Sequence, residues 1–509
     1  MSLPEGKRLA AGALALACLI QPACGGEQKP EGERLARANC ASCHAFPEPR
    51  LLDRKTWEQG VLPRMAPRLG VPSTSLSEAM GRDPEMVVLN NTLPREDWEK
   101  IVAYYHDNAP AALPYQARTA EPQLDPPFFR VTPFSAGFRS SAIITVLRTD
   151  PSLGRIFIGQ AGSNTLNVFD WNRRLLSSLA LGSPPTDLTV EGDSVLVLES
   201  GILDPNDQPK GSLVKYELAG GDSLRAPRLV LDSLFRPVFA REFDFDGDGR
   251  KEILVCEYGN NRGRLALYRH DGARYQRRVL DANPGAIRFE IRDMTGDGAP
   301  DIVALFAQAD ERIVLFENDG KGNFSQGARV LARFPPVYGS MYFSMNDFNG
   351  DGHMDIVYVN GDNFDYSRVL KPYHGVRILE NDGKNAFAER FFFPVYGAAR
   401  AEVADFDKDG DLDILTTSNF ADAERHPERG IVYLENVGRY AFRPYAFSAG
   451  ARNEWNLTAT GDLNRDGWLD VIVGAMDLRS IGQLQHQYSG PSKTAKDPLL
   501  FFENRMRPR

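Results

Sequence analysis

Two cysteines three positions apart, followed at once by a histidine, are the residues of the N-terminal region best suited to chemistry. The stretch 39–44 reads Asn-Cys-Ala-Ser-Cys-His, which places Cys40, Cys43 and His44 in a C-x-x-C-H spacing. That spacing is typical of c-type haem attachment, in which both thiols form thioethers with the porphyrin and the histidine becomes an iron ligand. A zinc half-site or a redox dithiol is the alternative, but no second C-x-x-C completes a zinc cage.

Helical patterns lie on both sides of this motif. Residues 33–38 form an amphipathic run that leads into it, and Pro94 stands at a first-turn position of a second run. One face of that second run holds Trp98, Ile101, Val102 and Tyr105. A helix leading into C-x-x-C-H and a C-terminal Trp/Tyr helix resemble class I cytochrome c. The resemblance implies a small all-α haem domain over residues 24–110, with its two terminal helices packed together.

The sixth iron ligand has several candidates, among them Met65, Met80 and Met86. We favour Met65, because the stretch from Trp57 to Met65 resembles the distal segment of haem domains fused to propellers. Met86 is the second choice because it just precedes the last helix, and His106, at a helix end, is the third. A methionine ligand raises the reduction potential and closes the open iron position, which favours electron transfer over oxygen chemistry.

The first residues read as a secretion signal, with a basic start and an apolar stretch over residues 9–20. The following Ala-Cys-Gly-Gly resembles a bacterial lipoprotein cleavage site, which would remove residues 1–23 and leave Cys24 as the acylated first residue. Cys18 is a rival site, and ordinary signal peptidase cleavage is the alternative. We expect an exported protein, in the periplasm or at the cell surface, anchored by lipid to a bacterial membrane.

Length and composition bound the rest of the chain. Its 509 residues are too many for one ordinary core, and a net charge of −9 argues against nucleic acid as a partner. No internal apolar run is long enough to span a bilayer. The remaining cysteine, Cys256, lies in an apolar run and is predicted to be a buried core thiol. Residues 111–127 are rich in proline and are predicted to be a semi-rigid linker.

Residues 128–509 contain five copies of one Asp- and Gly-rich loop, 49 to 58 residues apart. Oxygen side chains at loop positions 1, 3, 5 and 9 converge on a cation when the chain wraps around it, and calcium accepts such a set best. The predicted ligands are Asp244, Asp246, Asp248 and Glu252; Asp293, Thr295, Asp297 and Asp301; Asp347, Asn349, Asp351 and Asp355; Asp405, Asp407, Asp409 and Asp413; and Asp462, Asn464, Asp466 and Asp470. Thr295 replaces Asp or Asn, so we expect its loop to bind most weakly.

These loops resemble FG-GAP and VCBS repeats, the calcium-loop blades of integrin-like β-propellers. A second recurring element, an apolar strand such as 313–317 or 431–435, occurs seven times and predicts seven blades, the first two without calcium loops. The chain ends just after the last such strand, so the last blade lacks its outer strand. We predict that residues 127–134 supply it and close the ring.

Together these features predict an all-α cytochrome c domain followed by an all-β seven-bladed propeller with about five calcium ions. The leading hypothesis is a single-electron carrier whose propeller is the docking scaffold for a redox partner protein. One alternative is an oxidoreductase whose propeller carries a substrate site that reduces the haem, and another is an adhesion or ligand-recognition propeller with an accessory haem. No nucleophile triad or paired-carboxylate site stands out. The loop histidines His353, His374, His426 and His486 are candidates for a propeller mouth.

Overall fold

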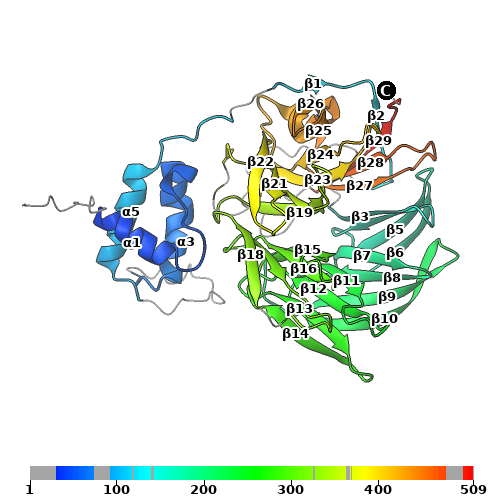
Figure 1. Cartoon of the computed structure of the whole chain (residues 1–509), viewed down its shortest axis with the longest axis horizontal. Helices are drawn as coiled ribbons and strands as arrows, with labels where there is room; N and C mark the ends of the chain where they lie inside the picture. The colour runs from blue at the N-terminus through cyan, green and yellow to red at the C-terminus, as the bar shows by residue number, and fades with distance from the viewer. Residues whose placement is uncertain are drawn as a thin grey trace, which may run out of the picture.

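The computed structural model describes residues 30–73, 92–116, 120–138, 143–324, 327–362, 367, 369–476 and 497–507. Helices come first in the chain and lie beside a ring of β-sheets (Figure 1). The helical elements are α1 (Glu31–Cys40), η1 (Pro49–Leu51), α2 (Arg54–Thr56), the π-helical η2 (Trp57–Val61), α3 (Leu62–Arg68) and α5 (Arg95–Asn108), with η3 (Pro427–Gly430) and η4 (Ser448–Arg452) inside the ring region. None of the described helices is both long and apolar enough to cross a membrane.

The first and last N-terminal helices pack against each other, as the sequence predicts. A Cβ added to Gly32 of α1 would lie only 2.5 Å from the carbonyl oxygen of Lys100 in α5, so the two backbones touch at this crossing. Below it, the ring of Tyr105 lies 4.5 Å from that of Trp57, and both residues are buried. The indole of Trp57 donates to the carbonyl of Pro49 at 2.7 Å, which satisfies its one polar atom.

Seven antiparallel sheets form the ring, and we number these blades in chain order. Blades 1 to 3 contain β3 (Ile144–Asp150), β4 (Arg155–Gln160), β5 (Thr165–Asp170), β6 (Leu175–Ala180); β7 (Pro185–Glu191), β8 (Ser194–Glu199), β9 (Gly211–Ala219), β10 (Ser223–Leu234); and β11 (Pro237–Phe243), β12 (Glu252–Glu257), β13 (Arg264–His270), β14 (Tyr275–Asp281). Blades 4 and 5 contain β15 (Ala286–Arg292), β16 (Asp301–Phe306), β17 (Arg312–Phe316), β18 (Ala328–Arg333); and β19 (Ser340–Asn346), β20 (Asp355–Asn360), β21 (Gly375–Asn381), β22 (Phe387–Pro394).

Blades 6 and 7 each take a strand from the chain that precedes the ring. Blade 6 contains β23 (Ala398–Ala404), β24 (Asp413–Ser418), β25 (Ile431–Asn436), β26 (Phe442–Ala446) and the short β1 (Gln123–Leu124). Blade 7 contains β27 (Trp455–Gly461), β28 (Asp470–Ala475), β29 (Leu499–Asn504) and β2 (Phe129–Pro133). The seven recurring apolar strands of the sequence are the third strands of the seven blades, so the predicted seven-bladed propeller is confirmed.

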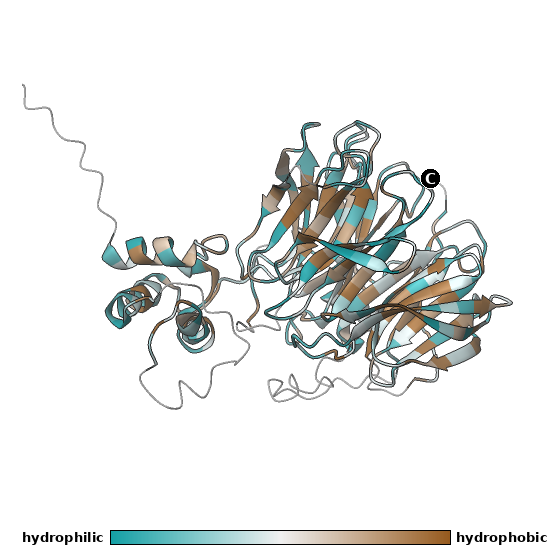
Figure 2. Cartoon of the chain, turned by 90° about the horizontal axis from the view of Figure 1, so that it is seen from below, coloured by the Kyte–Doolittle hydropathy of each residue, from teal (hydrophilic) through white to brown (hydrophobic). Residues whose placement is uncertain are grey.

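The apolar core of the ring lies between blades. Strands such as β12 and β16 are buried along their whole length, because each of their faces packs on a neighbouring blade. One apolar cluster fills each of the seven spaces between neighbouring blades. Cys256 is fully buried in the cluster between blades 3 and 4, which confirms the predicted core thiol. In Figure 2 brown stretches accordingly follow the strands within the ring.

The ring is closed by β2, as predicted from the missing outer strand of the last blade. Its residues pair antiparallel with β29, from Phe129 opposite Asn504 to Pro133 opposite Leu500. The predicted linker, residues 111–127, also contacts the ring. Within it β1 pairs parallel with β26, and the buried Gln116 donates through Nε2 to the carbonyl of His374 at 2.8 Å. The chain between helices and closing strand is therefore fixed to the propeller at several points.

We expect Gly32→Ala to destabilise the helical segment by about 1–3 kcal/mol, because the added methyl group must push α1 away from α5. Urea unfolding followed by helical circular dichroism measures this change. Gly162→Ala is the matched control, because the nearest side-chain atom, Cδ1 of Ile143, would be 4.0 Å from the new Cβ. An unchanged unfolding midpoint for the Gly32 variant would show that the helices do not cross at this point.

Candidate functional site

The C-x-x-C-H motif lies at the end of α1 and in the turn that follows. Cys40 is the last residue of α1 and is partly buried, whereas Cys43 is exposed. Burial raises the pKa of the Cys40 thiol to about 11. A reactive dithiol needs a lowered pKa in its attacking cysteine, so Cys40 itself is poorly suited to that role. The exposed Cys43 and the partly buried Cys40 suit two thioether links on the edge of a bound porphyrin.

His44 has the environment of a neutral imidazole ligand. Its Nδ1 lies 2.9 Å from the carbonyl oxygen of Ala45. Because a carbonyl only accepts hydrogen bonds, this contact places the proton on Nδ1 and leaves the lone pair of Nε2 free. Burial also lowers the pKa of His44, which keeps the ring uncharged at neutral pH. A neutral imidazole with one free nitrogen is the form that binds iron.

Met65 lies on α3 and packs on the same apolar cluster as Cys40. Phe46 and Val61 border this cluster as well. His106, the third candidate, is half exposed and its Nδ1 pairs with the carboxylate of Glu58. Met80 and Met86 lie outside the described residues, as do Cys18 and Cys24. The assignment of Met65 as the sixth iron ligand stays a prediction.

The motif is in contact with the propeller. Nη2 of Arg333, at the end of β18, donates to the carbonyl of Cys43 at 3.5 Å. The hydroxyl of Tyr373 donates to the carbonyl of Leu51 at 3.0 Å, and Val337 is buried in the helical cluster. Arg68 of α3 reaches Asn261, in the loop after β12, at 3.2 Å. The helical segment is thus held by the loops of blades 3 to 5 on the side where β12, β16 and β20 end.

The five predicted calcium loops occupy equivalent places in blades 3 to 7. Each joins the first strand of its blade to the second, and its ninth residue begins the second strand. In the first loop the two oxygens of Asp244 accept the amides of Gly247 and Gly249, at 2.7 and 2.9 Å. The amides therefore wrap around the first carboxylate and turn positions 3 and 5 toward it. Asp244, Asp246 and Asp248 each bring an oxygen within 4.8 Å of the others, and so do Asp405, Asp407 and Asp413.

The ninth residue of each loop is buried and joins the loop to its blade. The two oxygens of Asp413 accept the amides of Phe406 and Asn436, at 3.1 and 2.8 Å. Burial raises the pKa of Asp413 to about 7 and that of Asp470 to about 6. A bound cation would stabilise these carboxylates in their charged form.

The first loop differs from the others because arginines pair with its acids. Arg269 lies 3.1 Å from both Asp246 and Glu252, and Arg250 lies 2.7 Å from Asp248. These guanidinium groups would compete with a cation for the carboxylates of this loop. In the second loop Thr295 stands among the carboxylates, and the expectation that this loop binds most weakly stays a prediction. The calcium function of all five loops likewise stays a prediction.

Sequence reasoning missed four asparagines that brace these loops. Asn318, Asn381, Asn436 and Asn504 each follow the glutamate that ends the recurring strand of blades 4 to 7, one residue beyond the motif used to count blades. Asn504 of blade 7 donates from Nδ2 to the carbonyl of Phe406 in the loop of blade 6 at 2.9 Å. Asn318 of blade 4 makes the same bond to Phe245 in the loop of blade 3 at 2.9 Å. The Glu-Asn pair that recurs at the end of these strands is the sequence feature that could have indicated these asparagines.

The predicted histidine mouth is not formed by the described histidines. His374 is fully buried, His353 is the seventh residue of the third loop, and His426 pairs with Glu428. None of these three lines the central cavity of the ring. His486 lies outside the described residues.

Two stretches of the chain match the FG-GAP-like repeat family. They are residues 244–304 and 293–358, which contain the first three loops. No curated protein matches the chain. Among solved structures, the chain is similar to the N-terminal domain of Nup159 (11% identity, 76% of this chain and 99% of that chain, TM-score 0.41) and to streptogramin B lyase (11%, 74% and 97%, 0.44). It is also similar to the calcium-binding protein regucalcin from Agrobacterium tumefaciens (13%, 62% and 95%, 0.37).

Excess chelator is expected to lower the melting temperature of the propeller by several degrees. When the free cation concentration is a hundred times the dissociation constant, binding stabilises the folded state by about 2.7 kcal/mol per site. Chelation removes this stabilisation and so lowers the melting temperature. Differential scanning calorimetry with and without calcium measures the shift. Asp409→Ala should remove one bound calcium, whereas Asp411→Ala in the same loop, at a position that offers only its carbonyl, should keep it. An identical melt in excess chelator contradicts structural calcium.

Proposed function

We propose that this chain is an exported, lipid-anchored c-type cytochrome that transfers single electrons, with a calcium-stabilised propeller as its docking scaffold. The observation that supports this most is the environment of the C-x-x-C-H turn. It follows a helix, borders an apolar cluster that includes Met65, and is bonded to the propeller through Arg333. An exported cytochrome needs such a turn, because the haem must be covalently retained and presented at a fixed place.

Under this proposal Cys40 and Cys43 would hold the porphyrin, and His44 and Met65 would supply the two iron ligands. A bound iron porphyrin supplies a reversible one-electron change. The residues of the chain would set the reduction potential of that change. The apolar cluster would exclude water, and the hydrogen bond from Nδ1 of His44 to the carbonyl of Ala45 would fix the orientation of the imidazole. Asp310 and Arg333 of the propeller are the charged groups that act on His44.

The propeller serves as a rigid platform for a redox partner protein. Its contacts with the helices place the exposed Cys43 next to propeller surface, so a partner that docks there meets the edge of the haem. Five loop cations, by neutralising crowded carboxylates, would keep the blades in register. The lipid on Cys24 would hold the protein at a bacterial membrane.

A membrane fraction containing the partner is expected to reduce the haem of the purified protein, whereas small-molecule substrates alone leave it oxidised. Stopped-flow absorbance at the haem bands measures both reactions. Arg333→Ala should slow partner-driven reduction but not reduction by dithionite, because only docking depends on the propeller contact. Arg329→Ala, on the same strand and equally exposed at 44%, is the matched control. Rapid reduction by a substrate without any partner would instead establish an oxidoreductase.

Met65→Leu is expected to abolish the sulfur ligand of the iron. The vacated position should then bind carbon monoxide in the reduced state, and the reduction potential should fall. Absorbance and redox titration measure the two effects. Met86→Leu should leave both properties unchanged. Loss of the ligand in the Met86 variant, with Met65→Leu unaffected, would reassign the sixth position.

A further inference from the structure

A central cavity of about 430 Å³ lies where the first strands of the seven blades meet. Each of those strands supplies at least one lining side chain: Arg148 (β3), Asp187 (β7), Phe239 (β11), Arg288 (β15), Tyr342 (β19), Arg400 (β23) and Asn456 (β27). Small-molecule sites in proteins have volumes of roughly 300–1,000 Å³. The cavity is therefore large enough for a small organic ligand, and three of these side chains are guanidinium groups.

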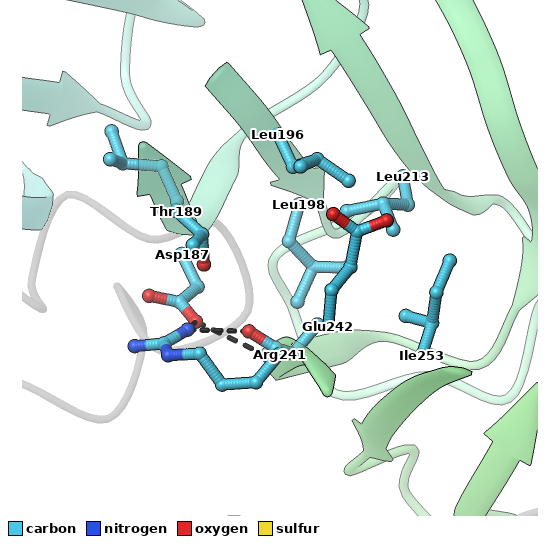
Figure 3. A pocket seen from close by; sticks show the side chains of 10 residues that line it. Asp187, Thr189, Leu196, Leu198, Leu213, Arg241, Glu242 and Ile253 are labelled. Carbon is cyan, nitrogen blue, oxygen red and sulfur yellow. Dashed lines mark hydrogen bonds and ion pairs between the residues drawn. The ribbon is translucent and has the colours of Figure 1, made fainter. Parts of the chain in front are cut away.

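One of the two acids on the wall, Asp187, is already neutralised. Asp187 accepts from Arg148 at 2.9 Å and from Arg241 of the neighbouring blade at 2.5 Å, and Figure 3 shows the Asp187–Arg241 contact. Although burial acts to raise it, the pKa of Asp187 is lowered by Arg241 and Arg148. One carboxylate between two guanidinium groups leaves this part of the wall positive.

The opposite part of the wall holds a guanidinium group with an unused donor. Tyr342 lies between Arg288 and Arg400, whose guanidinium carbons are 4.7 and 4.3 Å from the centre of its ring. Arg288 donates to Glu290 at 2.7 Å. In contrast, Nε of Arg400 is buried and has no hydrogen-bond partner within the described part of the chain.

The nearest acid pairs with Arg400 only through a long contact. Oε1 of Glu402 forms an ion pair with Nε of Arg400 at 3.6 Å, which is beyond hydrogen-bond distance, and also accepts from the hydroxyl of Thr458 at 2.5 Å. Burial lowers the pKa of Arg400, and the like charges of Arg288 and Arg148 add to that effect. An anion that approaches Arg400 would therefore stabilise its charged form.

Two more polar atoms on the adjoining strands lack partners. Nδ2 of Asn456 on β27 and Oγ1 of Thr145 on β3 make no hydrogen bond to any described residue, although their residues are only 8% and 9% exposed. Buried polar groups are normally satisfied, and an unpaired one costs about 1–3 kcal/mol. Together with Arg400, these atoms provide three hydrogen-bonding groups from β23, β27 and β3, which are consecutive around the ring.

We propose that the central cavity binds a small organic anion, a carboxylate with an apolar body. Arg400 and Asn456 would donate to the carboxylate, and Thr145 would complete its shell. The apolar body would lie against the side chains that form the rest of the wall, among them Leu147, Val238, Ile287, Met341 and Leu457. This site goes beyond electron transfer and does not depend on bound haem.

Benzoate is the probe, and the uncharged benzamide is its control of the same shape. Isothermal titration of the full chain with calcium present should show one saturable benzoate site and at least tenfold weaker binding of benzamide, because hydrogen bonds to charged groups are worth more than neutral ones. Arg400→Gln should weaken benzoate binding at least tenfold. Arg225→Gln, on the exposed strand β10 and 68% exposed, should leave it unchanged.

Asn456→Ala provides a second, smaller change should Arg400→Gln not fold, and it should weaken benzoate binding severalfold. Circular dichroism and the haem absorbance of each variant report folding and haem content separately from ligand binding. Equal binding of benzamide and benzoate, or no saturable benzoate binding at about 10 mM, would overturn the proposal. Either result would leave the haem proposal untouched.

Discussion

The antiparallel pairing of β2 with β29 is the interaction on which the rest of the structure depends. It joins the beginning of the ring region to its end, so that all seven spaces between blades can be filled by apolar clusters. Without it blade 7 would expose an unpaired edge and the last cluster would open. The chain that precedes β2 is fixed by further contacts, because β1 and Gln116 are bonded to blades 6 and 5 just upstream. The helical segment is thereby brought to one side of the ring.

The loops extend this closure from the backbone to the side chains. The buried acid at the ninth position ties each loop to its own blade, and in two places an asparagine of the next blade ties it to its neighbour. The carboxylates at loop positions 1, 3 and 5 are crowded and repel one another. Bound cations would neutralise this repulsion and allow the loops to hold the ring rigid. Neutralisation by cations would give a physical reason for repeated acidic loops in a closed ring of blades.

Local patterns predict most of the fold, because helices, third strands and loops are specified by nearby residues. The helix that ends at Cys40, the helix with Trp98 and Tyr105, and the closing strand are all found where the sequence indicates. Individual side-chain contacts between distant segments were not predictable in this way. The bond from Arg333 to Cys43 joins residues 290 apart, and the cavity arginines come from separate blades. Periodicity carries no information on such pairs, and the two-residue strand β1 is too short to have a pattern.

The central claim is that Cys40 and Cys43 carry a covalently bound haem. Intact-mass spectrometry, after expression in a host that attaches c-type haem, tests it most directly. The account predicts one population heavier than the processed polypeptide by a single haem, and no such addition in a Cys40→Ser, Cys43→Ser double variant. A processed polypeptide of unmodified mass, colourless although the host matures other c-type cytochromes, would contradict the redox account and leave only the propeller.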